Sequence, residues 1–234
     1  MTLGAPASPP EVSDDDIFSL GKIRSALGSR ASAPAGTGQS PNVTPDRALR
    51  HAAVALLLRE GTRSSGLVHG EGGSELLLIR RAVHEQDPWS GHMALPGGRQ
   101  DPTDDSLLAT VQRETLEEVG VDLARHGELL GRLPVLPAMA RGRVLGMTVT
   151  PFVFALSNEP ELCLNYEVAE VVWAALGTLS SGRVNTVVTY EGAQPPVQLP
   201  GWDLEGRVVW GLTHRMVSSL LEIVRGPVTL SKGR

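Results

Sequence analysis

One stretch, running from Leu95 to Val121, constrains the fold of this 234-residue chain more than any other. It begins with a Pro-Gly-Gly turn, continues through an acidic loop, and then carries apolar residues at the spacing of an amphipathic helix. The residues that would form the buried stripe are Leu107, Leu108, Val111 and Val119. Gly120 follows at the place where a left-handed residue commonly ends a helix. The stretch therefore predicts a loop and a helix that ends at Gly120.

The residues before this helix suit a helix N-terminus. Thr103 and Ser106 have hydroxyl oxygens that can accept hydrogen bonds from free N–H groups of the first turn. Negative charge near a helix N-terminus is stabilised by the helix dipole. The acidic residues that supply it are Asp101, Asp104 and Asp105.

Three glutamates of the predicted helix lie on one face. Glu114, Glu117 and Glu118 are spaced i, i+3 and i+4, and Arg113 is beside them. Because carboxylates this close repel one another, some should hold protons more tightly than a free glutamate does. A hard cation such as Mg²⁺ removes that repulsion, since it prefers oxygen ligands and keeps water and phosphate oxygens in its shell. The alternative is a solvated acidic helix face, because exposed charge is common on helices.

This pattern resembles the Nudix box, G-x5-E-x7-R-E-U-x-E-E-x-G-U, in which U is aliphatic. Gly98 opens the match, and its second half is filled by Arg113, Glu114, Glu117, Glu118, Gly120 and Val121. Thr115 stands where an aliphatic residue is usual. The loop is one residue longer than the motif, so Asp104 or Asp105 can replace the first glutamate of the box, and we favour Asp105.

The resemblance to the Nudix superfamily implies a diphosphate hydrolase that acts on a nucleoside diphosphate linked to another group, with Mg²⁺ or Mn²⁺ as the metal. It also implies an α/β fold, an α/β/α sandwich around a central mixed β-sheet. Within the box, the resemblance assigns metal binding to Glu114, Glu117, Glu118 and the carbonyl of Gly97. Arg113 would hold the glutamates in orientation by ion pairing.

Further candidate site residues lie outside the metal-ligand set. Many Nudix enzymes use an additional carboxylate as metal ligand or general base, and Glu167 is the first candidate here and Glu170 the second. Arg80 and Arg81 end a predicted strand, and a planar guanidinium suits diphosphate oxygens. These arginines and Gly98 are the expected substrate-binding residues.

Segments on both sides of the box resemble the coenzyme A pyrophosphatase subfamily. They are LLLIRRA with GHMALPGG before the box, VTPFVF and the Glu167–Glu170 segment after it, and VWGLT before the last predicted helix. The resemblance implies hydrolysis of coenzyme A or acyl-coenzyme A. Residues 84–87 (HEQD) stand where that subfamily usually has a basic residue.

Two other functions remain open at this point. One is a Nudix hydrolase of ADP-ribose, a dinucleotide or a nucleotide sugar, which a pocket without the usual cation would favour. The other is a catalytically silent Nudix module that binds a nucleotide or a partner protein. The intact glutamate set argues against the silent module, because such a module does not need crowded carboxylates.

Composition limits the partners and the compartment. The net charge of −5 argues against a nucleic-acid-binding protein, which usually has a basic face. A single cysteine, Cys163, cannot form an internal disulfide and fits a reducing cytosol. No apolar run is long enough for a membrane helix. We therefore expect a cytoplasmic protein that binds a small nucleotide and not a membrane, and by analogy with other Nudix domains it could form a homodimer.

The chain divides into an N-terminal extension, residues 1–46, and a Nudix domain, residues 47–234. The extension is rich in Pro, Ala, Ser and Gly but contains one amphipathic segment, with Leu20, Ile23 and Leu27 at helical spacing and Gly28 as its stop. This helix should pack on the domain or on a partner. Predicted strands of the domain include 51–59, 75–81, 128–136, 148–156, 185–190, 197–199 and 207–210, and a final helix should run to about Arg225.

Overall fold

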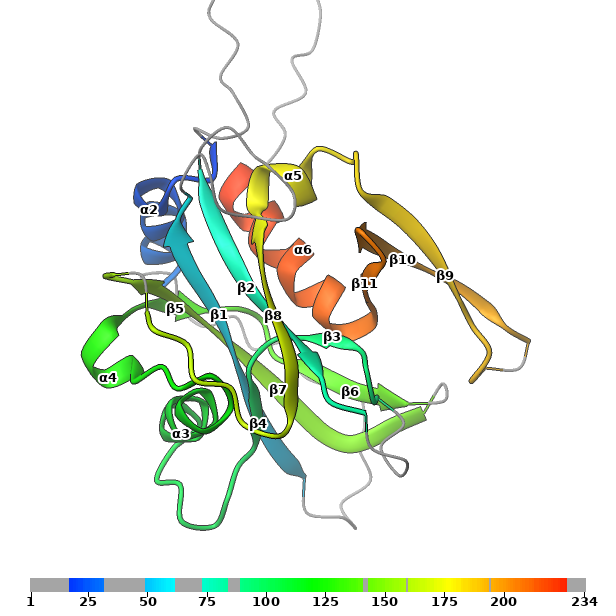
Figure 1. Cartoon of the computed structure of the whole chain (residues 1–234), viewed down its shortest axis with the longest axis horizontal. Helices are drawn as coiled ribbons and strands as arrows, with labels where there is room; N and C mark the ends of the chain where they lie inside the picture. Colours follow the sequence, from blue (N-terminus) through cyan, green and yellow to red (C-terminus); the bar gives the residue numbers. More distant parts are fainter. Residues whose placement is uncertain are drawn as a thin grey trace, which may run out of the picture.

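The computed structural model describes residues 17–31, 49–61, 73–83, 89–140, 143–158, 160–193 and 195–226. Its helices are α2 (Leu20–Ala31), α3 (Leu107–Val119), α4 (Leu123–His126), α5 (Leu176–Ser180) and α6 (Gly211–Arg225). Its strands are β1 (Arg50–Glu60), β2 (Ser74–Arg81), β3 (Met93–Ala94), β4 (Gly97–Arg99), β5 (Gly127–Arg132), β6 (Leu136–Ala140), β7 (Arg143–Leu156), β8 (Val168–Ala175), β9 (Asn185–Tyr190), β10 (Val197–Leu204) and β11 (Arg207–Trp210). Figure 1 shows their arrangement.

A mixed sheet of eight strands lies at the centre of the described structure. β1 runs parallel to β7 and antiparallel to both β2 and β4. β8 extends the sheet beside β2, while β5 and β6 both pair with β7. β1 and β2 pair as antiparallel strands, and the Gly61 N–H donates to the Gly73 carbonyl at 2.8 Å. The predicted α/β fold with a central mixed sheet is confirmed.

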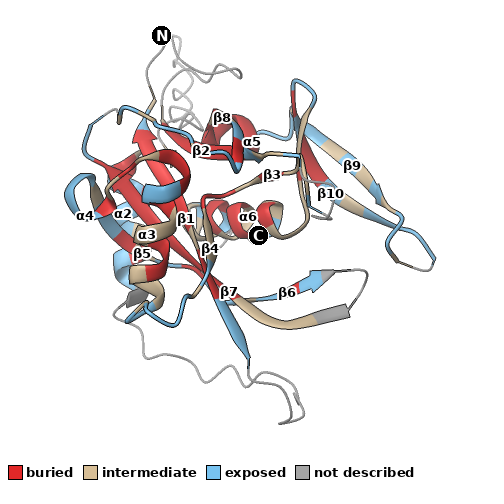
Figure 2. Ribbon diagram, turned by 60° about the horizontal axis from the view of Figure 1, so that its bottom comes forward, coloured by how far each residue is buried: buried red, intermediate tan, exposed pale blue. Residues whose placement is uncertain are grey.

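Helices cover both faces of this sheet. Along β2, Leu77 and Ile79 pack with Val111 and Val119 of α3 in one buried cluster. Leu76 and Leu78, which alternate with them, pack in a second cluster whose members also include Phe18, Ile23, Met216, Val217 and Leu220. Because side chains alternate across a strand, α3 covers one face and α2 with α6 covers the other. Figure 2 shows the buried strands between these helices.

The predicted helix of the N-terminal extension is present as α2 and joins the core of the domain. Phe18, Ile23 and Leu27 are almost fully buried against it. Arg24 pairs with Glu128 of β5 at 2.6 Å on the exposed side. The expected stop at Gly28 is wrong, because the helix continues to Ala31. The division at residue 46 stays a prediction, since residues 32–48 lie outside the described ranges.

One predicted strand is two separate strands. The chain over 128–136 leaves β5 at Arg132 and enters β6 at Leu136. The Leu133 N–H still donates to the Pro151 carbonyl at 3.0 Å, but Pro134 has no N–H with which to continue the pairing. Hydrophobic pattern alone does not show where such a break falls.

A smaller sheet of β9, β10 and β11 stands beside the central sheet (Figure 1). The Thr213 hydroxyl of α6 donates to the Met93 carbonyl of β3 at 3.3 Å, which ties the helix that follows β11 to the edge of the central sheet. Across the described ranges, no helix is both long and apolar enough to span a membrane.

Candidate metal and diphosphate site

The helix at the centre of the site, α3, begins and ends where the sequence predicts. The Ser106 hydroxyl accepts a hydrogen bond from the Ala109 N–H at 3.1 Å and caps its N-terminus. Gly120 ends it with a left-handed φ of 76°. A Cβ at Gly120 would also approach the Cβ of Cys163 to 2.8 Å, so glycine is required there for two reasons.

The Gly97–Gly98 turn brings the backbone of β4 against the glutamates of α3. Gly97 has a φ of 140°, and a Cβ there would overlap the Ala53 carbonyl oxygen of β1. Its N–H donates to Oε2 of Glu118 at 2.8 Å. A Cβ on Gly98 would overlap the carboxylate of Glu114. Two glycines are therefore needed so that two glutamates can lie directly against this strand.

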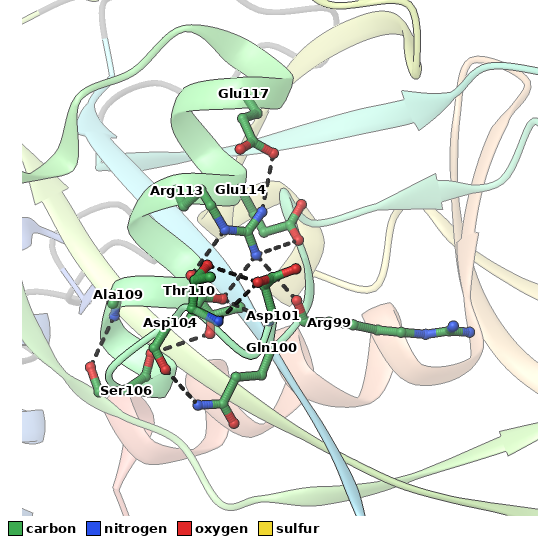
Figure 3. A network of polar contacts seen from close by, with 11 residues as sticks. Arg99, Gln100, Asp101, Asp104, Ser106, Ala109, Thr110, Arg113, Glu114 and Glu117 are labelled. Atoms are coloured by element: carbon green, nitrogen blue, oxygen red, sulfur yellow. Dashed lines mark hydrogen bonds and ion pairs between the residues drawn. The ribbon is translucent and has the colours of Figure 1, made fainter.

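Arg113 is the centre of the polar network drawn in Figure 3. Its Nε and Nη2 donate to the two carboxylate oxygens of Asp104 at 3.0 and 2.9 Å. Nη2 also lies 3.1 Å from Oε1 of Glu114, and Nη1 donates to Oε2 of Glu117 at 3.1 Å. The Asp104 side chain is almost completely buried, with 5% of its surface exposed. The proposed ion pairing of Arg113 with the glutamates is thus present for two of the three.

The preference for Asp105 in the loop is wrong. Asp104 is the carboxylate that forms a two-point pair with Arg113, whereas Asp105 is exposed. The loop decides this, because the Asp104 carboxylate also accepts a hydrogen bond from the Asp101 N–H at 2.9 Å, which turns it inward. The hydrogen bonds from Arg113 hold the pKa of Asp104 well below its usual range, so Asp104 is charged.

Two of the box glutamates hold protons more tightly than a free glutamate. Burial raises the pKa of Glu118 to about 7, even though the Gly97 N–H stabilises its charged form. Burial also raises the pKa of Glu114, with Arg113 acting in the opposite direction. The direction agrees with the sequence-based expectation, but burial and not mutual repulsion is the main cause. Glu117, with 53% of its side chain exposed, reaches solvent.

The donor chemistry of this site fits a hard divalent cation. Glu114, Glu117 and Glu118 offer carboxylate oxygens, the ligands that Mg²⁺ and Mn²⁺ prefer. In the part of the chain that the structure describes, no group of three or more Asp, Glu, His or Cys side chains is arranged closely enough to hold a metal ion as it stands. Arg113 pairs with Glu114 and Glu117, and the Gly97 N–H donates to Glu118, so each of the three carboxylates has a hydrogen-bond or ion-pair partner.

The two predicted substrate arginines lie on opposite faces of the sheet. Arg81 acts on Glu118, whose pKa its charge lowers, so it lies on the face of α3. Arg80 instead pairs with Glu170, its Nε 3.2 Å from Oε2. The two arginines point to opposite faces because successive side chains of a strand alternate between the two faces of the sheet. In the pairing of β2 with β8, a register shift also falls between them.

The two candidate carboxylates outside the box, Glu167 and Glu170, lie on different sides of the sheet. The charge of Glu167 raises the pKa of both Glu114 and Glu118, so Glu167 belongs to the box side. Its carbonyl accepts a hydrogen bond from the Ala82 N–H at 2.7 Å, next to Arg81. Glu170 is bound by Arg207, whose hydrogen bond lowers the pKa of this carboxyl and makes it a poor base. Sequence reasoning did not identify Arg207, because 37 residues separate it from Glu170.

The HEQD segment at residues 84–87, where the resembled subfamily usually has a basic residue, lies outside the described ranges, as do residues 141–142.

The chain is an α/β protein with a central mixed sheet. Its acidic site lies where the glutamates of α3 pack against the Gly97–Gly98 turn. The chain belongs to the Nudix family. The family model described as the NUDIX domain matches residues 50–187, which is more than half of its 234 residues. The family prediction made from the box is therefore confirmed.

Two sequence relatives and one solved structure show what the chain is similar to. The uncharacterized protein C14C4.10c of Schizosaccharomyces pombe is 37% identical over 164 residues, which cover 66% of this chain and 50% of the relative. The chain thus spans about half the length of that relative. The uncharacterized Nudix hydrolase NudL of Yersinia pestis is 35% identical over 152 residues, 64% of this chain and 72% of the relative. The solved C. elegans Ap4A hydrolase binary complex is 21% identical, with a TM-score of 0.43 and coverage of 56% of this chain and 84% of that one.

Proposed function

We propose that this protein is a metal-dependent hydrolase of a diphosphate bond in a nucleoside diphosphate derivative. The observation that carries the proposal is the packing of Glu114 and Glu118 against the Gly97–Gly98 turn. Burial raises the pKa of both carboxyls, and perturbed carboxyl groups gathered in one place are typical of functional sites.

Each residue of the site has a distinct proposed role. Glu114, Glu117 and Glu118, with the Gly97 carbonyl, would hold Mg²⁺ or Mn²⁺. The cation would neutralise phosphate charge and lower the pKa of a water molecule. Arg113 keeps the glutamates oriented through its pairs with Asp104 and Glu114, and Asp104 fixes Arg113 by two hydrogen bonds.

Glu167 is the proposed general base, and Arg81 is the proposed contact for phosphate oxygens. Glu167 takes one proton from the attacking water, whose oxygen forms a bond to one phosphorus as the bridging P–O bond breaks. Two monophosphate products leave. The catalytic contribution of the protein is then mainly positioning and charge neutralisation.

Coenzyme A or acyl-coenzyme A is the first proposed substrate. The support is the resemblance of the flanking segments, LLLIRRA with GHMALPGG and VWGLT, to the coenzyme A pyrophosphatase subfamily. ADP-ribose, a dinucleotide or a nucleotide sugar is the alternative, favoured by the HEQD sequence at residues 84–87 where a basic residue is usual. We further propose a cytoplasmic setting and a possible homodimer.

Hydrolysis of coenzyme A and of ADP-ribose by the purified protein tests this proposal. Each compound is incubated with Mg²⁺ or Mn²⁺, and the products are identified by mass. Faster cleavage of coenzyme A at its diphosphate supports the first substrate, and turnover of ADP-ribose alone supports the alternative. Failure of a wide panel of diphosphates would refute the hydrolase and favour the silent module.

The base is tested separately. Glu167→Gln should lower kcat by roughly 10²- to 10⁴-fold, the usual contribution of a general base, while the KM for the substrate stays close to normal. Glu161→Gln, an exposed glutamate nearby in the chain, is the matched control and should keep the normal rate. A Glu167→Gln rate close to that of the control would exclude Glu167 as the base.

A further inference from the structure

The outer edge of the small sheet is a strand that pairs on one side only. The strands of this sheet lie in the order β11, β10, β9, so β9 has β10 on one side and, within the described ranges, no strand on the other (Figure 1). The backbone N–H and C=O groups along such an edge are a template for pairing with another strand. The edge of β9 is therefore a candidate interaction surface.

The sequence of β9 lacks the features that usually protect an edge strand. Its six residues, NTVVTY, include no charged side chain, no proline and no glycine, and four of them are β-branched. Charged side chains, proline and bulges on an edge strand normally prevent pairing with another chain. The pairing of β9 with β10 is continuous, without a bulge, and Val187 in the middle of the strand is 63% exposed. The strand thus presents a regular, apolar edge.

The pairing with β10 determines which backbone groups of β9 point outward. In an antiparallel ladder, opposite residues either exchange hydrogen bonds or exchange none, and the two kinds of pair alternate. The Asp203 N–H donates to the Val184 carbonyl at 2.8 Å, so the even-numbered residues here bond toward β10. Val187 lies opposite Pro200, which has no N–H to donate and so fits a pair without hydrogen bonds. Val187 therefore directs its own N–H and C=O away from β10, toward the open edge.

Pairing of β9 with β9 of a second copy matches both hydrogen bonding and charge. With Val187 opposite the partner's Val187 on a two-fold axis, Asn185 lies opposite Thr189. The same register places Arg183, just before the strand, opposite Glu191, just after it, and both side chains are exposed. Opposite charges that face each other across paired strands are stabilising, and the symmetry supplies this pair twice. A register shifted by two residues in either direction separates the two charges.

Existing contacts leave most of this edge available. The Asn185 N–H donates to the Gly182 carbonyl at 3.2 Å, so only the Asn185 carbonyl is counted toward a partner. Arg183 donates from its Nε to the Ser181 hydroxyl at 3.2 Å, a contact that does not use its terminal nitrogens. The ring of Tyr190 packs against that of another residue of the same sheet, with 5.7 Å between the ring centroids.

We propose that two copies of this chain form a dimer by antiparallel pairing of their β9 strands across a two-fold axis at Val187. Four backbone hydrogen bonds join the copies, one from each Val187 N–H to the opposite Val187 carbonyl and one from each Thr189 N–H to the carbonyl of Asn185. The small sheets, of three strands each, become one continuous sheet. This gives the possible homodimer a specific interface, and it does not depend on the hydrolase activity.

The mass of the purified full chain, measured by analytical ultracentrifugation, tests the dimer. Concentrations of roughly 1 to 100 μM are needed, because an interface built on one strand pair is small and should have a micromolar dissociation constant. The mass should double over this range. Val187→Lys should keep the protein monomeric, because two like charges then meet at the axis. Val135→Lys, at a valine outside the small sheet that is 55% exposed, is the matched control and should dimerise normally.

Charge reversal tests the register. Arg183→Glu and Glu191→Arg each place like charges opposite one another, and each should raise the dissociation constant at least about fourfold. The double variant restores opposite charges and should return to the dissociation constant of the natural protein. Such a rescue is not expected of residues that only support the fold of their own copy.

Every other result overturns the interface. A monomer at all concentrations would do so, and it is the result expected if another segment of the same chain covers β9. A dimer that persists in Val187→Lys, or single reversals that the double variant does not rescue, would place the contact elsewhere. Because the mass is measured without substrate, a β9 dimer that hydrolyses none of the diphosphates offered would uphold the interface and refute the activity.

Discussion

Replacing Glu118 by glutamine should make the metal-free protein more stable while it abolishes turnover. Glu118 is 3% exposed, and its carboxylate accepts a hydrogen bond from the Gly97 N–H. Burial raises its pKa to about 7 from an ordinary value of 4.5. The amide of glutamine is nearly the same size and can accept the same hydrogen bond, but it carries no charge that burial disfavours.

The magnitude follows from the difference between the folded and unfolded pKa values. Between about pH 4.5 and 7 the folded Glu118 keeps a proton that the unfolded chain has lost, so the free energy of unfolding decreases as the pH rises. Above that range the ionised side chain costs about 3 kcal/mol. The free energy of unfolding of the Glu118→Gln variant should therefore exceed that of the natural protein by about 3 kcal/mol at pH 8, and by less than about 1 kcal/mol at pH 5.

Urea unfolding at both pH values, in the presence of EDTA, measures this difference. Glu117→Gln is the control, because water reaches its half-exposed carboxylate, and it should gain no comparable stability at pH 8. With Mg²⁺ or Mn²⁺ and substrate, both variants should lose turnover by orders of magnitude. A stability gain that is the same at pH 5 and pH 8, or no gain at either, would refute burial of a charged carboxylate as the reason. Near-normal turnover of both variants would refute the metal assignment.

Three further predictions test the loop, the turn and the N-terminal helix. Asp104→Asn should lower kcat at least about tenfold because the box arginine loses a two-point charged partner, whereas Asp105→Asn should keep a normal rate. Gly97→Ala should destabilise the protein by several kcal/mol in urea unfolding, because a Cβ there overlaps a carbonyl of β1; Gly21→Ala, where the added Cβ meets nothing within 4 Å, should be neutral or stabilising. Ile23→Ala should cost about 2 to 5 kcal/mol because this side chain of α2 is fully buried, and a loss below about 1 kcal/mol would show that the helix contributes little to the core.

Much of the site could be predicted because its signals are local. The N-cap at Ser106 and the stop at Gly120 depend on residues within one helical turn. The common face of the three glutamates depends only on the helical period. The same reasoning identified the N-terminal helix but placed its end at Gly28. The helix continues to Ala31 because a glycine in a helix interior costs only about 1 kcal/mol, which packing of the other residues can offset.

The family, the mixed α/β fold and the position of an acidic helix after a glycine turn could all be predicted from the amino-acid sequence. These follow from periodicity, turn chemistry and a motif that spans a single loop and helix. The tertiary structure decided which aspartate pairs with Arg113, which face each of Arg80 and Arg81 occupies, and that Arg207 binds Glu170. It also decided that Glu118 is buried and Glu117 is not. Burial, strand register and contacts between distant residues arise only when the layers pack together, so no local pattern contains them.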